Sequence, residues 1–375
     1  MGKKTEFVYL SEPDCIAAGV MDIPRCIENA EEVFRLLARG DYLMGGPDHN
    51  SHGMYLVFPE ESAFPGMPLA GPDRRFVAMP AYLGGRFAIC GQKWYGSNAE
   101  NKKKGLPRSV LMLTLNDKDT GEPLCYMSGN LISAARTGAV PAVGARYLAR
   151  KDSKVLTCVG CGPIGEACME AVLTEMSGLN RVILHNHSPR RAELLAVKVR
   201  EKYHLEAVVE PDLEQAVRQA DVISIAASRT APLHLCRSWV KKGTTLLVSG
   251  PVQCEEALWM DMDIVWDHIP LHHAYVREAI QSGDRRKGYA QVIGGPIYHL
   301  IDEGKKPALD DSLEIGKIIL QEQPGRTADD QILCFIACGM AVFDLGLGYD
   351  LYRQALEQGI GQRLLLWNSP AQSET

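Results

Sequence analysis

The chain has 375 residues, of which 46% are hydrophobic and 23% are charged, and its formal net charge is −6. This length exceeds what one hydrophobic core usually serves, so we expect two domains. The negative charge and the lack of a basic stripe argue against nucleic-acid binding. No apolar run approaches the roughly 20 residues that span a bilayer, and no signal-peptide core is present. Eleven cysteines then indicate reduced thiols, so we expect a cytoplasmic protein with no membrane partner.

The first 140 residues predict a β-rich domain. A short strand at 7–10 precedes a helix from about 23 to 37, whose apolar residues keep helical spacing. Alternating segments that turn residues separate then predict further strands, at 76–83, 87–95 and 109–115. A polar stretch before them contains His49 and His52. We interpret this stretch as a polar loop or a substrate contact rather than as a metal site, and we predict no bound metal.

An alanine-rich helix at about 131–149 leads into a region where strands and helices alternate. This alternation predicts an α/β domain with a parallel, doubly wound sheet. Residues 312–322 and 329–357 read as helical, whereas 255–310 suggest no role. The expected strands lie at 155–159, 181–185, 206–209, 221–226 and 244–249, and the expected helices lie near 189–203 and 212–219.

A glycine-rich turn, Gly160-Cys161-Gly162-Pro163-Ile164-Gly165, follows the first of these strands and opens a helix. The first glycine permits a tight turn, the second lets a pyrophosphate approach the backbone, and the third lets the helix pack on the strand. The helix start also offers free N–H groups to phosphate oxygens. The spacing alone is equally compatible with a plain glycine turn, but the flanking strand and helix favour a dinucleotide site.

The second strand ends without the carboxylate that accepts hydrogen bonds from the ribose 2′-hydroxyl in NAD sites. A 2′-phosphate would be bound well by hydroxyl and guanidinium groups. We therefore predict NADP(H) rather than NAD(H). The alternative is that Arg190 and Arg191 are solvent-facing helix residues without a role in cofactor binding. The residues that we assign to this part of the cofactor site are Asn186, His187, Ser188, Arg190 and Arg191.

Two cations, Lys93 and Arg136, lie among small and apolar residues. Such a cation either extends to solvent or meets an anion. Taken alone, each of the two cations is better interpreted as extending to solvent.

Several segments resemble the ornithine cyclodeaminase/μ-crystallin family of NAD(P)-binding proteins, and they occur in the same order. The resemblance implies that 1–140 and 323–375 form an α+β substrate-binding and dimerisation domain. A Rossmann domain at 141–322 is then inserted between these two parts. The segments that carry the resemblance are 79–82, 91–93, 104–107, 134–140, 160–165 and 324–332.

The resemblance also implies roles for individual residues. Lys93 falls at the active-site lysine of the family, Arg136 at its substrate-carboxylate arginine, and Thr137 and Gly138 where the family contacts cofactor phosphate. Arginine suits bidentate carboxylate binding, and a desolvated lysine can serve as an acid or base. We further assign the ends of two later strands to the cofactor site, at Ala226, Ala227, Ser228, Ser249 and Gly250.

Two departures from the family pattern concern the substrate. Pro251 stands where cyclodeaminases of the family have an aspartate that contacts the substrate amine, and we consider Glu255 or Glu256 as its replacement. The family often has an arginine before the Met-Pro-Ala motif, for which His49 and His52 are the local candidates. The expected substrate site therefore comprises His49, His52, Lys93, Arg136 and Glu256.

We predict a homodimeric NADP-dependent oxidoreductase that transfers hydride at the α-carbon of an amino acid or its imine. One alternative is a cyclodeaminase that releases ammonia, which the loss of the aspartate at position 251 disfavours. Another is a non-enzymatic protein of μ-crystallin type that binds NADPH or a small ligand, which the retained Lys93 and Arg136 disfavour.

Overall fold

The computed structural model describes residues 3–227 and 233–371, and its contacts divide the chain into two compact units. The mixed-sheet unit contains residues 1–22, 40–133 and 340–375, and the Rossmann unit contains 23–39 and 134–339. Within the described residues, no helix is both long and apolar enough to cross a bilayer.

The mixed-sheet unit is built on an eight-stranded sheet in the order β18-β1-β7-β6-β5-β4-β2, with β3 also paired to β4. Strands β4 to β7 are antiparallel neighbours, whereas β1 runs parallel to β7. The strands are β1 (Thr5–Leu10), β2 (Tyr42–Met44), β3 (Met54–Val57), β4 (Arg75–Leu83), β5 (Ile89–Ser97), β6 (Ser109–Asp117), β7 (Pro123–Ser128) and β18 (Gln362–Trp367).

One face of this sheet is covered by helix α12 (Ala341–Gln358), which packs on β4, β5 and β6. Every second residue of β4 from Val77 to Leu83 is buried, as expected for a strand with one covered face. This unit also contains α1 (Glu12–Ala17) and a 3₁₀ segment, η1 (Ala99–Lys104).

The Rossmann unit contains an eight-stranded sheet in the order β10-β9-β8-β11-β13-β17-β15-β16, and all of its pairs are parallel. The chain leaves β8 toward β9 and β10 and then returns to β11, so the direction of winding switches between β8 and β11. Ligands of such sheets bind at the carboxyl edge beside this switch point. The strands are β8 (Val155–Val159), β9 (Arg181–His185), β10 (Glu206–Val209), β11 (Val222–Ile225), β13 (Thr245–Val248), β15 (Met262–Trp266), β16 (Leu313–Glu314) and β17 (Ile332–Ile336).

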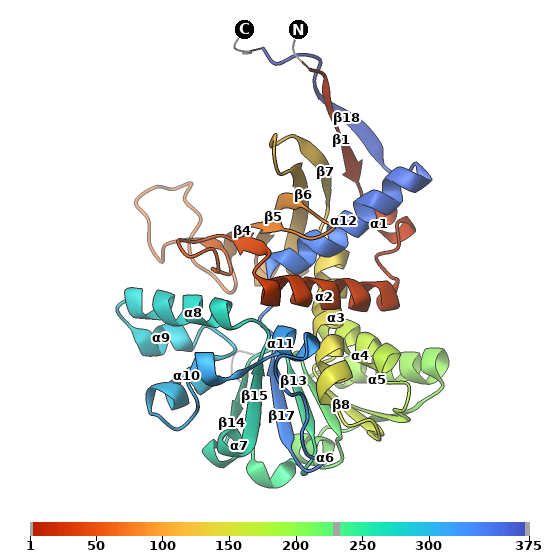
Figure 1. Cartoon of the computed structure of the whole chain (residues 1–375), viewed down its shortest axis with the longest axis vertical. Helices are drawn as coiled ribbons and strands as arrows, with labels where there is room; N and C mark the ends of the chain where they lie inside the picture. Colours follow the sequence, from red (N-terminus) through yellow and green to blue (C-terminus); the bar gives the residue numbers. More distant parts are fainter. Residues whose placement is uncertain (1–2, 228–232, 372–375) are drawn as a thin grey trace. The chain divides into compact units, whose positions relative to one another are not determined.

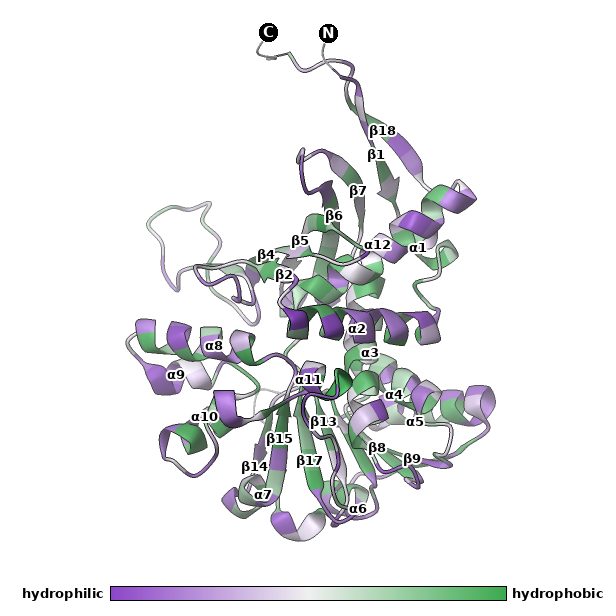
Figure 2. Cartoon of the chain, viewed as in Figure 1, coloured by the Kyte–Doolittle hydropathy of each residue, from purple (hydrophilic) through white to green (hydrophobic). Residues whose placement is uncertain are grey.

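Strand β17 is hydrophobic along its length, as Figure 2 shows, and β11, β13 and β17 are buried at every residue. Continuous apolar runs are typical of parallel strands with both faces covered. Helix α4 packs on β8 and β11, and α5 packs on β9 and β10, whereas α8 to α10 lie toward the end of the sheet that contains β15 (Figure 1). The helices are α2 (Ile23–Arg39), α3 (Asn130–Leu148), α4 (Pro163–Glu175), α5 (Pro189–Lys198), α6 (Leu213–Arg218), α7 (Glu256–Asp261), α8 (Ile269–Gln281), α9 (Arg285–Tyr289), α10 (Gly295–Asp302) and α11 (Ile315–Ile319). Shorter elements are the π-helical η2 (Val199–Tyr203), the 3₁₀ segments η3 (Arg237–Trp239) and η4 (Leu309–Asp311), and the strand pair β12 (Leu233–Leu235) and β14 (Val252–Cys254).

The parallel, doubly wound sheet is confirmed, but the predicted helix over 329–357 is wrong at its start. Residues 332–336 form β17, and the helix begins only at Ala341. A short, continuous apolar run does not distinguish a buried strand from a helix by its period. Because β17 lies between β13 and β15, residues 323–339 group with the Rossmann unit.

The predicted helix near 23–37 is present as α2, and its contacts place it in the Rossmann unit. It packs on α4 and α11. The Phe34 ring lies edge-on to Phe335 of β17, with 6.4 Å between the ring centroids. The Rossmann unit therefore begins outside the boundaries that the resemblance implied.

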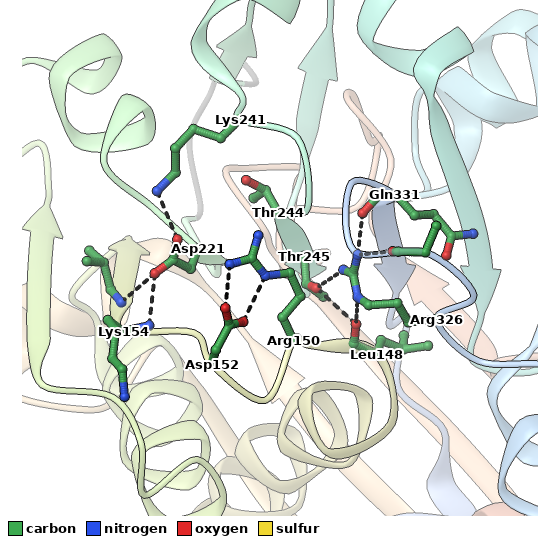
Figure 3. A network of polar contacts seen from close by, with 12 residues as sticks. Leu148, Arg150, Asp152, Lys154, Asp221, Lys241, Thr244, Thr245, Arg326 and Gln331 are labelled. Carbon is green, nitrogen blue, oxygen red and sulfur yellow. Dashed lines mark hydrogen bonds and ion pairs between the residues drawn. The ribbon is translucent and has the colours of Figure 1, made fainter.

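Arg326, in the Gly-Arg-Thr segment that contributed to the resemblance, has a structural role. Figure 3 shows its guanidinium at the amino edge of the Rossmann sheet. Nε donates to the Leu148 carbonyl at 2.9 Å, and Nη2 donates to Thr245 Oγ1 at 2.9 Å. Nη1 donates to the Gln331 carbonyl. Arg326 thus ties the end of α3 to the starts of β13 and β17.

Candidate functional site

The glycine turn after β8 is shaped by two close backbone approaches. Gly160 has φ +106°, and a Cβ added there would lie 2.8 Å from the Ala227 backbone nitrogen. A Cβ at Gly165 would lie 1.9 Å from the Gly160 carbonyl oxygen. Neither position has room for a side chain, as predicted for the first and third glycines of this motif.

Gly162, in contrast, faces open space. Among the described residues, a Cβ added there would meet only Arg191 Nη1 within 4 Å, at 3.8 Å. Gly162 is also the N-cap of α4, and among the described residues no side chain caps this helix start. Pro163 and Ile164 form the first positions of the helix. Free space beside uncapped N–H groups fits the pyrophosphate of a dinucleotide.

The segment after β9 is hydrogen-bonded to the glycine turn. Asn186 Oδ1 accepts a hydrogen bond from the Cys161 N–H at 3.0 Å, and its Nδ2 donates to the Ser188 carbonyl at 3.0 Å. Asn186, for which we predict a cofactor contact, therefore has a structural role in the structure, because its amide holds the glycine turn in place. His187 and Arg190 are exposed.

Ser188 is the N-cap of α5, and the exposed Arg191 lies in the first turn of that helix. A hollow of about 230 Å³ opens between α4 and α5, and Arg191 lies on its wall. No carboxylate occurs from the end of β9 through Ala192. The remaining residues that line the hollow are Cys161, Pro163, Glu166, Leu194, Leu195 and Lys198.

The ends of β11 and β13 lie close to the glycine turn. Ala226 and Ala227 contact Gly160, and a Cβ at Gly250 would lie 3.0 Å from the Ala227 carbonyl oxygen. The Ser249 N–H donates to the Ile225 carbonyl at 2.8 Å. The structure therefore brings these predicted cofactor residues together at the carboxyl edge. Ser228 lies outside the described residues.

Helix α3 approaches α4 one turn beyond the glycine motif. A Cβ at Gly138 would lie 2.5 Å from the Ala167 carbonyl oxygen, so only glycine permits this contact. The Cys168 thiol lies 3.7 Å from the Thr137 carbonyl oxygen, and burial raises the pKa of this thiol to about 12. Thr137 and Gly138 thus lie beside the first turns of α4, where the resemblance implied a phosphate contact.

Arg136 precedes this contact on α3 and is 9% exposed. Its guanidinium lies against the turn that follows β17, where Gly339 has φ +76°. A Cβ at Gly339 would lie 2.5 Å from Arg136 Nη1. The Rossmann unit therefore holds the guanidinium against a backbone that has no room for a side chain.

In the mixed-sheet unit, Lys93 forms a buried ion pair with Asp344 of α12. The distance from Nζ to Oδ2 is 2.9 Å, and the side chains are 4% and 1% exposed. The cross-strand neighbours of Lys93 are Met79 and Leu113, which are both buried. Asp344 was missed from the sequence, although an acid in the first turns of an otherwise apolar helix is a signal that could have identified it. Lys93 and Arg136 belong to different units.

The loop that contains His49 and His52 runs beside strand β4. A Cβ at Gly53 would lie 2.8 Å from Met79 Cγ, and Met79 is the cross-strand neighbour of Lys93. His52 Nδ1 lies 3.0 Å from the Tyr55 hydroxyl, and the two rings stack. His49 has φ +60° and accepts a backbone hydrogen bond from Met44.

Glu256 does not lie at the cofactor edge of the Rossmann sheet. It is the first residue of α7, which runs directly into the amino end of β15, and its side chain pairs with Lys305 at 2.8 Å. Glu255 accepts the Arg237 N–H in the same region. The structure therefore gives no support to either glutamate as a replacement for the family aspartate. Sequence proximity to β13 was misleading because β14 and α7 carry the chain to the opposite edge.

Comparison with known proteins agrees with the predicted class. The model of the ornithine cyclodeaminase/mu-crystallin family matches residues 21–359. N-((2S)-2-amino-2-carboxyethyl)-L-glutamate dehydrogenase of Staphylococcus aureus is 30% identical over 297 residues, which are 78% of this chain and 82% of that protein. Delta(1)-pyrroline-2-carboxylate reductase of Bacillus cereus is 28% identical over 298 residues, 80% and 87% of the two chains. A solved archaeal alanine dehydrogenase dimer with bound NAD has a TM-score of 0.77 and 25% identity, covering 97% of this chain and 100% of that one. These relatives are oxidoreductases named for amino- or imino-acid substrates.

Proposed function

The chain belongs to the ornithine cyclodeaminase/mu-crystallin family, and we propose that it interconverts an imino acid and the corresponding amino acid with a nicotinamide dinucleotide. The observation that carries this proposal is the glycine turn, where space beside Gly162 adjoins the uncapped start of α4 at the switch point of a parallel sheet. When bound there, the cofactor supplies hydride exchange with the substrate α-carbon.

Arg136 binds the substrate carboxylate in this proposal. Its guanidinium offers parallel N–H donors that match the two oxygens of a carboxylate. The close backbone at Gly339 limits how far the guanidinium can move. A fixed carboxylate fixes the α-carbon two bonds from its oxygens, and this orientation is what hydride transfer requires.

Lys93 moves the proton to or from the substrate nitrogen. The Asp344 carboxylate lies 2.9 Å from the ammonium and orients it. Burial of both side chains excludes water that would otherwise compete for the proton. Imine reduction needs an acid at the nitrogen, and amine oxidation needs a base there, so one lysine serves both directions.

We propose NADP(H) as the preferred cofactor. This choice is supported by the exposed Arg190 and Arg191, by Ser188 at the start of α5, and by the lack of a carboxylate after β9. The guanidinium and hydroxyl groups would hold a 2′-phosphate by charge-assisted hydrogen bonds.

We also propose that the protein is a homodimer in a reducing compartment, the cytoplasm. The archaeal alanine dehydrogenase is a dimer, and the mixed-sheet unit exposes large apolar side chains at Met54 (77%), Val57 (68%) and Phe64 (71%). Exposed apolar patches of this kind mark association surfaces. None of the eleven cysteines, which all lie within the described residues, forms a disulfide, and a reducing compartment maintains this state. Light scattering coupled to gel filtration should give a mass of twice the chain, and a monomer would refute the dimer.

The function is tested by following NADPH absorbance and ammonia together in one assay. Purified protein is mixed with cyclic imino acids, with keto acid and amine pairs, and with diamino acids. Net consumption of NADPH with an imino acid or a keto acid and amine supports the proposal. Ammonia release without net cofactor consumption would instead show a cyclodeaminase, and tight NADPH binding without any turnover would show a ligand-binding protein.

A further inference from the structure

Three buried polar side chains form a hydrogen-bonded chain at the carboxyl edge of the Rossmann sheet, in the region where the sequence suggested no role. Asp267 follows β15, His272 lies in α8, and Tyr298 lies in α10. His272 Nε2 lies 2.7 Å from Asp267 Oδ1, and His272 Nδ1 lies 2.5 Å from the Tyr298 hydroxyl. All three side chains are at most 1% exposed. Such a buried network is costly to leave unpaired, so it fixes Asp267 firmly.

The second oxygen of Asp267 holds the turn that follows β17. Asp267 Oδ2 accepts a hydrogen bond from the Cys338 N–H at 2.6 Å. The Asp267 N–H in turn donates to the Ile336 carbonyl at 3.1 Å, so both sides of the turn are attached to this residue. The next residue, Gly339, is the one whose added Cβ would lie 2.5 Å from Arg136 Nη1.

We propose that Asp267 is a positioning residue for Arg136. By fixing the Cys338–Gly339 backbone, it sets how far the guanidinium can retreat and thereby orients the substrate carboxylate. This inference rests on the proposed role of Arg136. Its physical basis is that the turn has little freedom to move. Asp267 holds the turn by a hydrogen bond on one side, and the Arg136 guanidinium lies against it on the other.

The same cluster has the composition of a metal site, but its geometry favours hydrogen bonding. Ligand atoms of Asp267, His272 and Cys338 lie within 4.8 Å of one another. However, the carboxylate oxygen and the imidazole nitrogen are only 2.7 Å apart. Two atoms bound to a tetrahedral zinc ion at about 2.0–2.1 Å would be held farther apart than this. Cys338 therefore contributes its backbone N–H to the network.

The experiment compares Asp267→Ala, Asp267→Asn and a matched control, Glu314→Gln. Glu314 forms a buried pair of the same chemistry, with His268 Nδ1 at 2.8 Å. Its other described contacts are with Ile269, Gln323 and Lys317 rather than with the Cys338–Gly339 turn. We expect Asp267→Ala to raise the KM for the carboxylate substrate about 10-fold or more, while the Kd for NADPH changes less than about twofold. Asp267→Asn keeps an oxygen for the Cys338 N–H and should restore most of this loss. Glu314→Gln should lower the Tm without changing KM.

A second readout does not depend on turnover. Iodoacetamide labelling of the native protein, followed by peptide mass spectrometry, reports the alkylation rate of Cys338, with the buried Cys168 as internal reference. We expect Cys338 to react faster in Asp267→Ala only. If the wild-type protein reduces no imino acid, the proposed function fails, and the labelling still decides whether Asp267 fixes the turn. An unchanged KM and labelling rate in Asp267→Ala, or an equal KM rise in Glu314→Gln, would overturn the inference. So would stoichiometric zinc in the wild type that Asp267→Ala loses.

Discussion

The Lys93 ammonium donates a hydrogen bond to Asp344 Oδ2 at 2.9 Å, and this contact joins strand β5 to helix α12 across 251 residues of chain. Because both side chains are almost completely buried, at 4% and 1% exposed, each charge is stabilised by the other. Removing one partner of a buried pair leaves an uncompensated charge and costs about 3–5 kcal/mol, whereas replacing both by apolar groups is often neutral.

This difference separates the chemistry of Lys93 from its structural role. We expect Lys93→Ala to abolish turnover and to lower the free energy of unfolding by about 3–5 kcal/mol. The double variant Lys93→Met with Asp344→Leu should regain most of the stability and remain inactive. Urea unfolding and NADPH consumption measure the two effects. Turnover in the double variant would remove Lys93 from the mechanism.

Substitution of Arg136 should affect the substrate and spare the cofactor. A charge-assisted hydrogen bond contributes about 1.5–3 kcal/mol, so we expect Arg136→Ala to raise the KM for the carboxylate substrate about 10- to 100-fold. Arg136→Lys should recover little, because an ammonium cannot form the bidentate contact. Initial rates over a range of substrate concentrations and NADPH binding by fluorescence give the two constants. Wild-type KM in Arg136→Ala would refute the assignment.

The glycine turn permits a sharper test, because its glycines differ in the space around them. In the described part of the chain, the methyl group of Gly162→Ala meets only Arg191 Nη1, at 3.8 Å, so this variant should fold with the wild-type Tm. Its methyl group would occupy the space we assign to the pyrophosphate, and we expect NADPH to bind about tenfold or more weakly, a loss of about 1.4 kcal/mol or more. Gly165→Ala would place a methyl group 1.9 Å from the Gly160 carbonyl oxygen, so it should lower the Tm itself. Unaltered cofactor affinity in Gly162→Ala would place the nucleotide elsewhere.

Cofactor choice should depend on the start of α5. Removing both guanidinium groups, with Arg190→Ala and Arg191→Ala, should lower kcat/KM for NADPH about tenfold or more through lost charge-assisted contacts. The value for NADH should change little, because NADH has no 2′-phosphate. The ratio of the two kcat/KM values is the measurement. An equal loss with both cofactors would mean that these arginines are solvent-facing residues without a role in selection.

Acid stability should depend on Asp221, which lies at the amino edge of the Rossmann sheet (Figure 3). Burial raises the pKa of this carboxyl, but the hydrogen bonds from Lys241 and from the N–H groups of Lys154 and Val155 outweigh it and lower the pKa below its ordinary value. A lowered folded-state pKa contributes stability above the unfolded value, about 3.9, and this contribution is lost as pH falls through the folded value. Asp221→Asn should therefore be less stable than wild type at neutral pH, and the difference should narrow as pH falls below about 4. A difference that does not change with pH would contradict this explanation.

Much of the Rossmann unit could be predicted from the sequence, because the alternation of strands and helices and the glycine spacing are local signals. Strand β17 could not be, since its apolar run is too short to show a period. The pairing in the two main contacts could not be predicted either, although the position of Asp344 in an otherwise apolar helix marked it as a candidate. Asp344 meets Lys93, and Asp267 meets Cys338, only after distant segments pack together. Glu256 shows the reverse error. It follows β13 closely in sequence, but it begins α7, which lies at the opposite edge of the sheet from the cofactor turn.

Isotope transfer reports directly whether hydride passes from the nicotinamide to the substrate α-carbon. NADPH that carries deuterium at the transferable position of nicotinamide C4 is incubated with the protein and a cyclic imino acid, and the amino acid product is analysed by mass spectrometry. We expect deuterium at the α-carbon of the product, in proportion to the NADPH consumed, and about tenfold slower product formation with Gly162→Ala at a subsaturating cofactor concentration. An unlabelled product, or an imino acid that is left unreduced while NADPH remains unchanged, would contradict this expectation.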